Sequence, residues 1–360
     1  MRHAFIAVCG ALFVSQAARA LIPITTGPDI VWHGDFDGAG AVLSGNCNFG
    51  MDGYCSEEVN RTAQVQILTS PLAEGQHAAY FEVKHGDFYP PPPNNYSENR
   101  ALLDPSYSGW APLPDGTSEL WYRWQVYLPP DYVASWPHED DHTTCAHALG
   151  TSDATTAQRR GGGYNVEWHQ DTTPAGAPQG SAPIYFSTGS VVDPHALTRT
   201  DYFTFLLNGN YGNTQIVSSN LMQIVRGKWV DWVVHIKFST DPAVGFIEAW
   251  ADSGSGLVNV LPRVNNATMY TIPQTTTPLR NFWAVGLYRD QCVGAPNMTY
   301  TDAANTPVYP QGPAAPLTVA YFDGFVIGRT RASVYNQPLY DLDLPVVIKT
   351  ASGKIVTLSF

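Results

Sequence analysis

Apolar and polar residues alternate along several short segments of this chain, which is typical of β-strands with one buried face. In residues 228–239, the residues that share the apolar face are Trp232, Val234, Ile236 and Phe238. The same alternation occurs in residues 77–85, 119–129, 245–252, 281–290 and 319–328. We therefore predict that each of these segments is a strand with one apolar face and one mixed face.

Turn-forming residues separate these segments, since the chain contains 31 Gly and 28 Pro, and patterns with the period of a helix are scarce. Strands of this kind bury their apolar faces by pairing two sheets. We predict an all-β fold, a β-jelly-roll sandwich of two antiparallel sheets in which one concave sheet presents a substrate groove. We expect one domain over residues 21–360, with long polar loops at 138–163 and 296–317.

The N-terminal residues 1–20 differ from the rest of the chain. They begin with a short basic stretch, continue with an apolar run, and end in Ala18-Arg19-Ala20. This is the pattern of a secretory signal peptide cleaved after small residues. We predict a secreted protein, extracellular or, in a Gram-negative bacterium, periplasmic. No later apolar run approaches the ~18 residues that a membrane helix requires.

The cysteine content agrees with export. Cys9 lies in the predicted signal peptide, so four cysteines remain, an even number for an oxidising compartment. We prefer the disulfides Cys47–Cys55, which would close a small loop, and Cys145–Cys292, which would join two distant loops. Four cysteines allow three pairings, so the other two stay open.

Charge restricts the class of partner. The chain carries 19 Lys and Arg against 31 Asp and Glu, a net charge of −12, which argues against nucleic acid and anionic membranes as partners. It contains no nucleophile elbow, phosphate-binding loop or dinucleotide-binding glycine pattern. Sequons that would allow N-glycosylation begin at Asn60, Asn95, Asn266 and Asn297.

The segment NVEWHQ (165–170) concentrates polar chemistry on one face of a predicted strand. Alternation places Asn165, Glu167 and His169 together, opposite the core-forming Val166 and Trp168. A lone histidine of this kind usually has a structural role, with its ring hydrogen-bonded to a neighbour. An amide, a carboxylate and an imidazole in one row instead favour a site that binds a ligand or moves protons.

Two further residues are candidates for the same site. Tyr288 shares a strand face with Ala284 and Gly286, whose small size leaves room for a ligand, although a tyrosine packed over glycine would look the same. Arg100 begins the strand SENRALL, and its guanidinium suits a carboxylate. An ordinary ion pair with Glu98 is the alternative for Arg100.

A second polar strand face carries Arg123, Gln125 and Tyr127. These side chains either line the same groove or face solvent, and we include them as candidate substrate-binding residues.

Metal binding is weakly indicated. The histidines His138, His142 and His147 lie in an acidic stretch that lacks the HExxH pattern, and a solvated loop explains them better. Asp35, Asp37 and Asp323 are turn or strand-end carboxylates of the kind that sometimes holds a structural Ca²⁺. We expect no cofactor to be required for catalysis.

Several segments, taken in order, resemble the jelly-roll polysaccharide lyases grouped with heparin lyase I and glucuronan lyase. The similar segments are SENRALL (97–103), LWYRWQVYLPPDY (120–132), NVEWHQ (165–170), GKWVDWVVHIKFSTDPAVGFIEAW (227–250), WAVGLYRD (283–290) and VAYFDGFVIG (319–328). No one motif is highly specific, but their order and spacing cover most of the chain after the predicted signal peptide.

The resemblance implies a polysaccharide substrate, in particular a polyuronate cleaved by β-elimination, and a monomeric enzyme. The family's catalytic histidine and tyrosine fall on His169 and Tyr288, and its carboxylate-binding arginine falls on Arg100. Two positions depart from the family. Glu167 stands where the lyases usually have Gln, and Ala284 stands where heparin lyases have Lys, which speaks against a heavily sulfated substrate.

Two other functions fit the same fold. The segments IVWHGDF (30–36) and EAWADSGS (248–255) are similar to family 131 glycoside hydrolases, which are jelly-roll glucanases. Hydrolysis would need two carboxyl groups, and Glu98 with Glu167 is the candidate pair. A non-catalytic carbohydrate-binding protein is the other alternative, because an aromatic groove alone would bind sugar.

Overall fold

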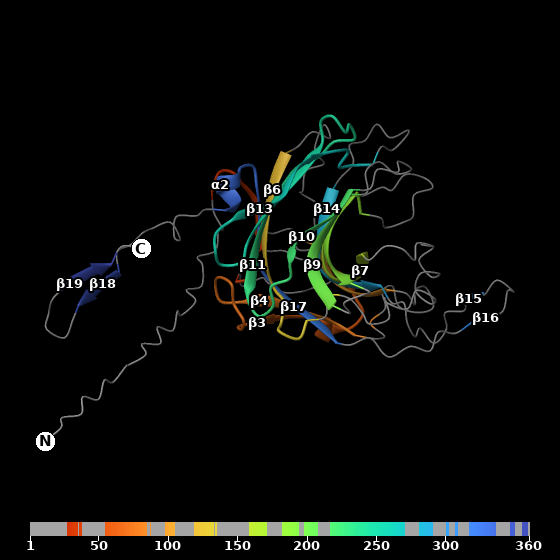
Figure 1. Ribbon diagram of the computed structural model, residues 1–360, viewed down its shortest axis with the longest axis horizontal. Helices are drawn as coiled ribbons and strands as arrows, with labels where there is room; N and C mark the ends of the chain where they lie inside the picture. Colours follow the sequence, from red (N-terminus) through yellow and green to blue (C-terminus); the bar gives the residue numbers. More distant parts are fainter. Residues whose placement is uncertain are drawn as a thin grey trace, which may run out of the picture.

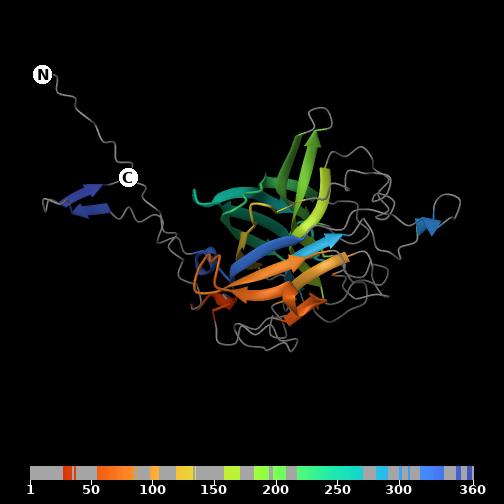
Figure 2. The same cartoon turned by 90° about the horizontal axis from the view of Figure 1, so that it is seen from below.

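The computed structural model shows an almost entirely β protein built from two stacked antiparallel sheets (Figures 1 and 2). The residues that it describes are 27–34, 36–37, 55–84, 87, 98–104, 119–132, 134, 158–170, 182–193, 198–207, 217–270, 281–290, 300–301, 307–308, 317–335, 346–349 and 355–358. The jelly-roll sandwich predicted from strand alternation is confirmed. Within this part of the chain, no helix is long and apolar enough to cross a membrane.

One layer is an eight-stranded sheet with the order β13-β12-β11-β6-β17-β4-β3, in which β1 also pairs with β17. Its strands are β1 (Ile30–Gly34), β3 (Val65–Leu68), β4 (Ala78–Val83), β6 (Glu119–Tyr127), β11 (Trp229–Lys237), β12 (Phe246–Asp252), β13 (Val258–Asn265) and β17 (Thr318–Gly328). A 3₁₀ turn, η1 (Thr62–Gln64), precedes β3, and the short helix α2 (Arg331–Val334) follows β17.

The other layer is a seven-stranded sheet with the order β10-β9-β8-β7-β14-β5-β2. Its strands are β2 (Cys55–Val59), β5 (Glu98–Asp104), β7 (Gln158–Gln170), β8 (Ile184–Asp193), β9 (Thr198–Leu207), β10 (Val217–Gln223) and β14 (Asn281–Asp290). Two small sheets stand outside these layers, formed by β15 (Tyr300–Thr301) with β16 (Pro307–Val308) and by β18 (Val346–Lys349) with β19 (Ile355–Leu358).

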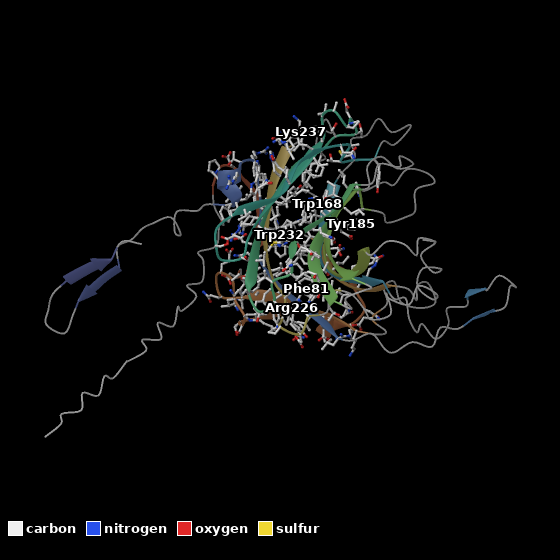
Figure 3. The ribbon with its side chains drawn as sticks, in the orientation of Figure 1. Phe81, Trp168, Tyr185, Arg226, Trp232 and Lys237 are labelled. Atoms are coloured by element: carbon white, nitrogen blue, oxygen red, sulfur yellow. The ribbon has the colours of Figure 1, made fainter. Side chains whose placement is uncertain are left out.

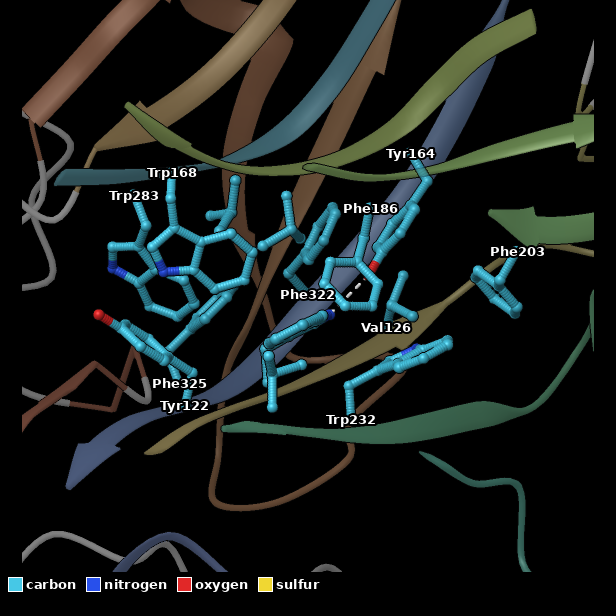
Figure 4. Packing of buried hydrophobic residues seen from close by; sticks show 14 of the residues in the cluster. Tyr122, Val126, Tyr164, Trp168, Phe186, Phe203, Trp232, Trp283, Phe322 and Phe325 are labelled. Carbon is cyan, nitrogen blue, oxygen red and sulfur yellow. Dashed lines mark hydrogen bonds between the residues drawn. The ribbon is translucent and has the colours of Figure 1, made fainter. Parts of the chain in front are cut away.

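Aromatic side chains from both sheets fill the space between the layers. Trp168 of β7 and Trp232 of β11, labelled in Figure 3, come from opposite sheets, and both point into the space between the layers, as Figure 4 shows. The indole Nε1 of Trp124 donates a 2.8 Å hydrogen bond to the Tyr164 hydroxyl across the interface, drawn as a dashed line in Figure 4. Aromatic rings bury large apolar areas, so these contacts supply much of the stabilisation of the sandwich.

Burial of alternate residues also defines the outer face of the seven-stranded sheet, by which we mean the face turned away from the core. Tyr164, Val166 and Trp168 of β7 are core residues. The residues between them therefore face outward, and so do the residues of β14 that alternate with its core residues Trp283, Val285 and Leu287. This outer face carries the site.

The predicted strands are confirmed within a few residues, but two of the predicted loops include residues that belong to strands. Residues 158–163 belong to β7, whereas we expected a loop as far as residue 163. The predicted loop at 296–317 contains β15 and β16. In both places a glycine-rich or polar stretch concealed strand pairing, because pairing depends on the neighbouring chain as well as on local sequence.

Candidate functional site

Arg100 and Tyr288 form the centre of the site. They are directly opposite one another in the antiparallel pairing of β5 with β14, and both side chains are partly exposed. The Arg100 Nη2 donates a 3.1 Å hydrogen bond to the Tyr288 hydroxyl, and the guanidinium carbon lies 4.2 Å from the centre of the tyrosine ring. A guanidinium over an aromatic ring is favoured by cation–π attraction, so each side chain orients the other. The pairing of β5 with β14 thus brings these two predicted site residues together.

Small residues surround Tyr288 on the strands beside it. Gly163 of β7 lies directly across from it, and Gly286 and Ala284 precede it on the same face of β14. None of the three has a side chain larger than a methyl group, so no bulky side chain from these positions covers the sheet next to the phenol. The glycine-rich run before Tyr164 was the signal for this feature, and we had assigned it to a loop.

Gly286 is required by its backbone conformation. Its φ is +149°, and a Cβ added there would lie 2.1 Å from the carbonyl oxygen of Ala101 in β5. L-residues rarely adopt such a φ, and carbonyl oxygen does not yield as a flexible side chain would. The added Cβ would also lie 2.9 Å from the ring of Phe81 in the core, so the close approach of β14 both to β5 and to the core depends on glycine at this position.

Asn165 and Glu167 form a second polar pair on the outer face. The Asn165 Nδ2 donates a 2.7 Å hydrogen bond to Glu167 Oε2, and both side chains are buried. Asn165 pairs with Gly286, which places it diagonally across from Tyr288, a separation of about 7–8 Å between Cα atoms in a sheet. A substrate held at Tyr288 would therefore be within reach of the Asn165 amide.

His169 lies farther away than the predicted site requires. It pairs with Phe282, which is six residues from Tyr288 along β14, a distance of about 20 Å in an extended strand. Only the backbone of His169 is described. The expected convergence of His169 with Tyr288 and Arg100 is thus not found. Alternation shows only that residues share a face, whereas their positions along the strand are set by the pairing register.

The same measure separates the two carboxylates proposed for a hydrolase. Glu167 pairs with Ala284 of β14, and Glu98 pairs with Asp290, again six residues away along that strand. That corresponds to about 20 Å along the strand. Glycosidase carboxyl groups lie about 5–5.5 Å or 6.5–9.5 Å apart. This pair therefore cannot act together on one glycosidic bond.

Arg123, Gln125 and Tyr127 belong to β6 in the other sheet, so the structure does not bring them to Tyr288. Their core-forming neighbours, such as Trp124 and Val126, point inward, which turns these three residues to the far side of the sandwich. The expectation that they line the same groove is wrong. Alternation correctly identified a polar face but gave no information on which sheet it belongs to.

Arg123 has a different role, in a buried charge network. Its Nη2 lies 2.8 Å from Asp231 Oδ2, its Nη1 lies 3.1 Å from Glu74 Oε2, and Gln125 Nε2 donates to Asp231 at 3.3 Å. Burial lowers the pKa of Arg123, but the two carboxylates more than offset this and leave the pKa above its usual range. Arg123 is therefore a permanent cation engaged in holding β6 against β11.

The carboxylates suggested for calcium accept hydrogen bonds from a turn. Asp37 Oδ1 accepts the backbone N–H groups of Gln76 and His77, both at 2.7 Å, while Asp323 Oδ2 accepts those of Ala73 and Glu74 at 3.2 and 3.1 Å. Among the described residues, no group of three or more His, Cys, Asp or Glu is arranged to hold a metal ion. Asp35 lies outside those residues, so the calcium site stays a prediction.

The disulfide and signal-peptide predictions fall largely outside the described residues. Cys47, Cys145 and Cys292 are outside them, as is the segment 1–20, and for Cys55 only the backbone at the start of β2 is described. Of the sequons, Asn60 is exposed whereas Asn266 is only 7% exposed. Glycosylation in the folded state would therefore be hindered at Asn266, and Asn95 and Asn297 lie outside the described part of the chain.

Two solved structures of carbohydrate-active enzymes are similar to this protein along most of its chain. A structure of an endo-beta-1,4-glucuronan lyase from the fungus Trichoderma reesei is 18% identical and covers 85% of this chain and 98% of its own, with a TM-score of 0.46. The catalytic domain of a family 131 beta-glucanase from Podospora anserina is 13% identical and covers 84% and 96%, with a TM-score of 0.43. A search of curated proteins found no match.

The sequence itself matches a family model over nearly all of the sandwich. The model is that of polysaccharide lyases, and the match spans residues 31–326, which include the Arg100–Tyr288 pair and most of β1 and of β17. This protein belongs to the polysaccharide lyase family.

Proposed function

We propose that this lyase cleaves a polysaccharide containing uronic acid by β-elimination at Tyr288 and Arg100. In that reaction a base removes the proton on C5 of the uronate, the C4–O4 bond breaks, and a C4–C5 double bond forms. The departing O4 takes up a proton and leaves as a hydroxyl. The protein must therefore neutralise a carboxylate, remove one proton and deliver another, all on one sugar.

The observation that carries the proposal is the contact between the Arg100 guanidinium and the Tyr288 phenol, with 3.1 Å between donor and acceptor. A guanidinium has several donors in a rigid fork, so it can bind a carboxylate while still contacting the phenol. Its charge stabilises the negative charge that develops on the carboxylate as the C5 proton leaves. Tyr288 is then next to the reacting carbons: as a phenolate it takes up the C5 proton, and the phenol so formed returns a proton to the departing O4, which regenerates the phenolate.

The neighbouring residues would bind the rest of the sugar. Asn165 lies diagonally across from Tyr288 and would contact a hydroxyl or the carboxylate, while Glu167, held by Asn165, orients that amide. His169 is about 20 Å along the strand from Tyr288, so we assign it to a different sugar of an extended chain. This revises the shared acid–base role that we expected for His169.

Substrate charge follows from the same residues. Ala284, on the same face of β14 as Tyr288, carries no charge. Glu167, which pairs with Ala284, adds a buried carboxyl group. Both features favour a polyuronate without dense sulfation, because sulfate groups would need cations nearby. We further propose that the protein is secreted, acts as a monomer and requires no cofactor for catalysis.

The test is direct. The purified protein is incubated with a panel of uronate polymers, and the ultraviolet absorbance of the unsaturated C4–C5 product is followed. We expect absorbance to grow with at least one polymer in wild type and to be nearly abolished by Tyr288→Phe. Saturated products alone, or undiminished activity in Tyr288→Phe, would contradict the proposal.

A further inference from the structure

The backbone of Arg100 is held by residues outside its own sheet pairing. Its N–H donates to the carbonyl oxygen of Asp87 at 3.1 Å, and its carbonyl oxygen accepts a 2.6 Å hydrogen bond from Gln64 Nε2. Gln64 closes the turn η1, while Asp87 follows β4. Two segments that are distant in sequence from β5 therefore fix the peptide groups on either side of the Arg100 Cα.

Gln64 is fully buried, and both ends of its amide are used. Its Oε1 accepts the backbone N–H of Asn60 at 2.7 Å and that of Arg61 at 2.9 Å, while its Nε2 donates to Arg100. A buried amide bonded at three points has little freedom to move. Gln64 thus connects the η1 turn rigidly to the backbone of Arg100.

Asp87 is fixed in the same way by Arg61. The Arg61 Nε and Nη2 bind the two Asp87 carboxylate oxygens at 2.7 and 2.9 Å, and the Lys84 N–H adds a 3.0 Å bond. Arg61 also contacts Glu82 of β4. Its hydrogen bonds to Asp87 and Glu82 raise its pKa above the usual range, so it stays charged. Because two carboxylates balance this charge, Arg61 competes weakly with Arg100 for an anionic substrate.

We propose that Gln64 and the Arg61–Asp87 pair are positioning residues, which set where the Arg100 guanidinium lies relative to Tyr288 and hence to the substrate carboxylate. This inference rests on the proposed function of Arg100. A guanidinium at the end of a long side chain moves when its backbone moves, and a misplacement of about 1 Å in a reacting group can cost about 10²-fold in rate. Gln64 acts only through Arg100 and touches no reacting atom.

Gln64→Glu isolates the relevant bond. In its ionised form the new carboxyl group still accepts the N–H groups of Asn60 and Arg61 but has no donor for the Arg100 carbonyl, so KM is compared at a pH above which it no longer changes. Gln66→Glu is the matched control, since Gln66 Nε2 also donates to a backbone carbonyl, that of Ala63, at 3.0 Å, but on an exposed side chain that does not contact Arg100. Because a displaced Arg100 guanidinium contacts the substrate carboxylate less well, we expect Gln64→Glu to raise KM for the polyuronate about tenfold, the cost of about one charge-assisted hydrogen bond, and Gln66→Glu to leave KM unchanged.

A double-mutant cycle with Arg100→Met separates positioning from a general structural effect. If Gln64 acts through Arg100, Gln64→Glu raises KM in the wild-type background and has no further effect in Arg100→Met. An equal effect in both backgrounds, or none in wild type, overturns the inference. Arg61→Lys, which keeps the charge but loses the two-pronged contact with Asp87, enters the same cycle if Gln64→Glu does not fold.

The cycle also distinguishes this inference from the proposed function. If Arg100→Met alone leaves KM and kcat unchanged, the role of Arg100 is wrong and the positioning inference fails with it. If Arg100→Met impairs the enzyme while Gln64→Glu and Arg61→Lys do not, the proposed function stands and only the positioning inference is overturned.

Discussion

Arg100 and Arg123 occupy comparable places on the two sheets, and their surroundings differ in a way that separates function from structure. Each lies on a strand face turned away from the core. Arg123 is buried and bound to two carboxylates, Asp231 and Glu74, at 2.8 and 3.1 Å. Arg100 is partly exposed and lies over the ring of a tyrosine whose hydroxyl it contacts. A buried cation with its charge balanced serves the fold, whereas a cation beside a phenol and small residues is suited to a ligand.

The strongest test of this comparison is Tyr288→Phe, which removes only the hydroxyl. We expect lyase turnover to fall by roughly 10²–10⁴-fold, the usual contribution of a positioned proton-transfer group. The melting temperature should change little, because the ring and its contact with Arg100 remain. Tyr127→Phe on the other sheet is the matched control and should retain full activity. A similar loss in both variants would show that the two faces are not functionally distinct.

Replacement by methionine should mainly affect stability at Arg123 and mainly affect KM at Arg100. Arg123→Met leaves Asp231 and Glu74 without their cation, so the free energy of unfolding should drop by about 3–5 kcal/mol. Arg100→Met, at a partly exposed position, should lower it by less than about 1 kcal/mol while raising KM. Denaturant unfolding and steady-state kinetics measure both effects. Equal destabilisation by the two changes would remove the distinction between them.

Gly286→Ala should disturb the pairing of β14 with β5, and with it the contact between Tyr288 and Arg100. The substitution combines an unfavourable φ with a Cβ 2.1 Å from the Ala101 carbonyl, and we expect a loss of about 1–3 kcal/mol in stability together with reduced activity. Gly254→Ala is the control, because its φ is +107° but nothing lies within 4 Å of an added Cβ. A comparable loss in both would assign the effect to φ alone and not to the contacts of the added Cβ with Ala101 and Phe81.

A smaller effect is the pH dependence of stability that Asp323, in β17 of the eight-stranded sheet, should cause. Burial, reinforced by nearby Glu74, raises the pKa of Asp323 well above its usual value. The folded state then holds a proton that the unfolded state releases, so this contribution is present below the ordinary aspartate pKa and is lost as pH rises toward the raised value. The unfolding free energy should therefore fall as the pH rises above the ordinary aspartate pKa toward this raised value, and Asp323→Asn should flatten the slope. An unchanged slope would show that Asp323 is ionised in the folded protein.

Residue alternation was enough to predict most of the strands and their inward and outward faces, and it singled out candidate site residues. Alternation identified the strand that carries Asn165 and Glu167, and small residues before Tyr288 indicated room for a ligand. These features are local, since the side-chain period of a strand and the size of a glycine need no information about the partner strand.

Which of these residues meet depends on the pairing of the strands in the folded protein. Pairing of β14 with both β5 and β7 brought Arg100 to Tyr288, placed Gly163 across from it, and left His169 six residues away. Membership of β6 in the opposite sheet removed Arg123 from the site. The physical reason is that alternation fixes a face but leaves register and sheet order free. Both are set by which strands bury their apolar faces together.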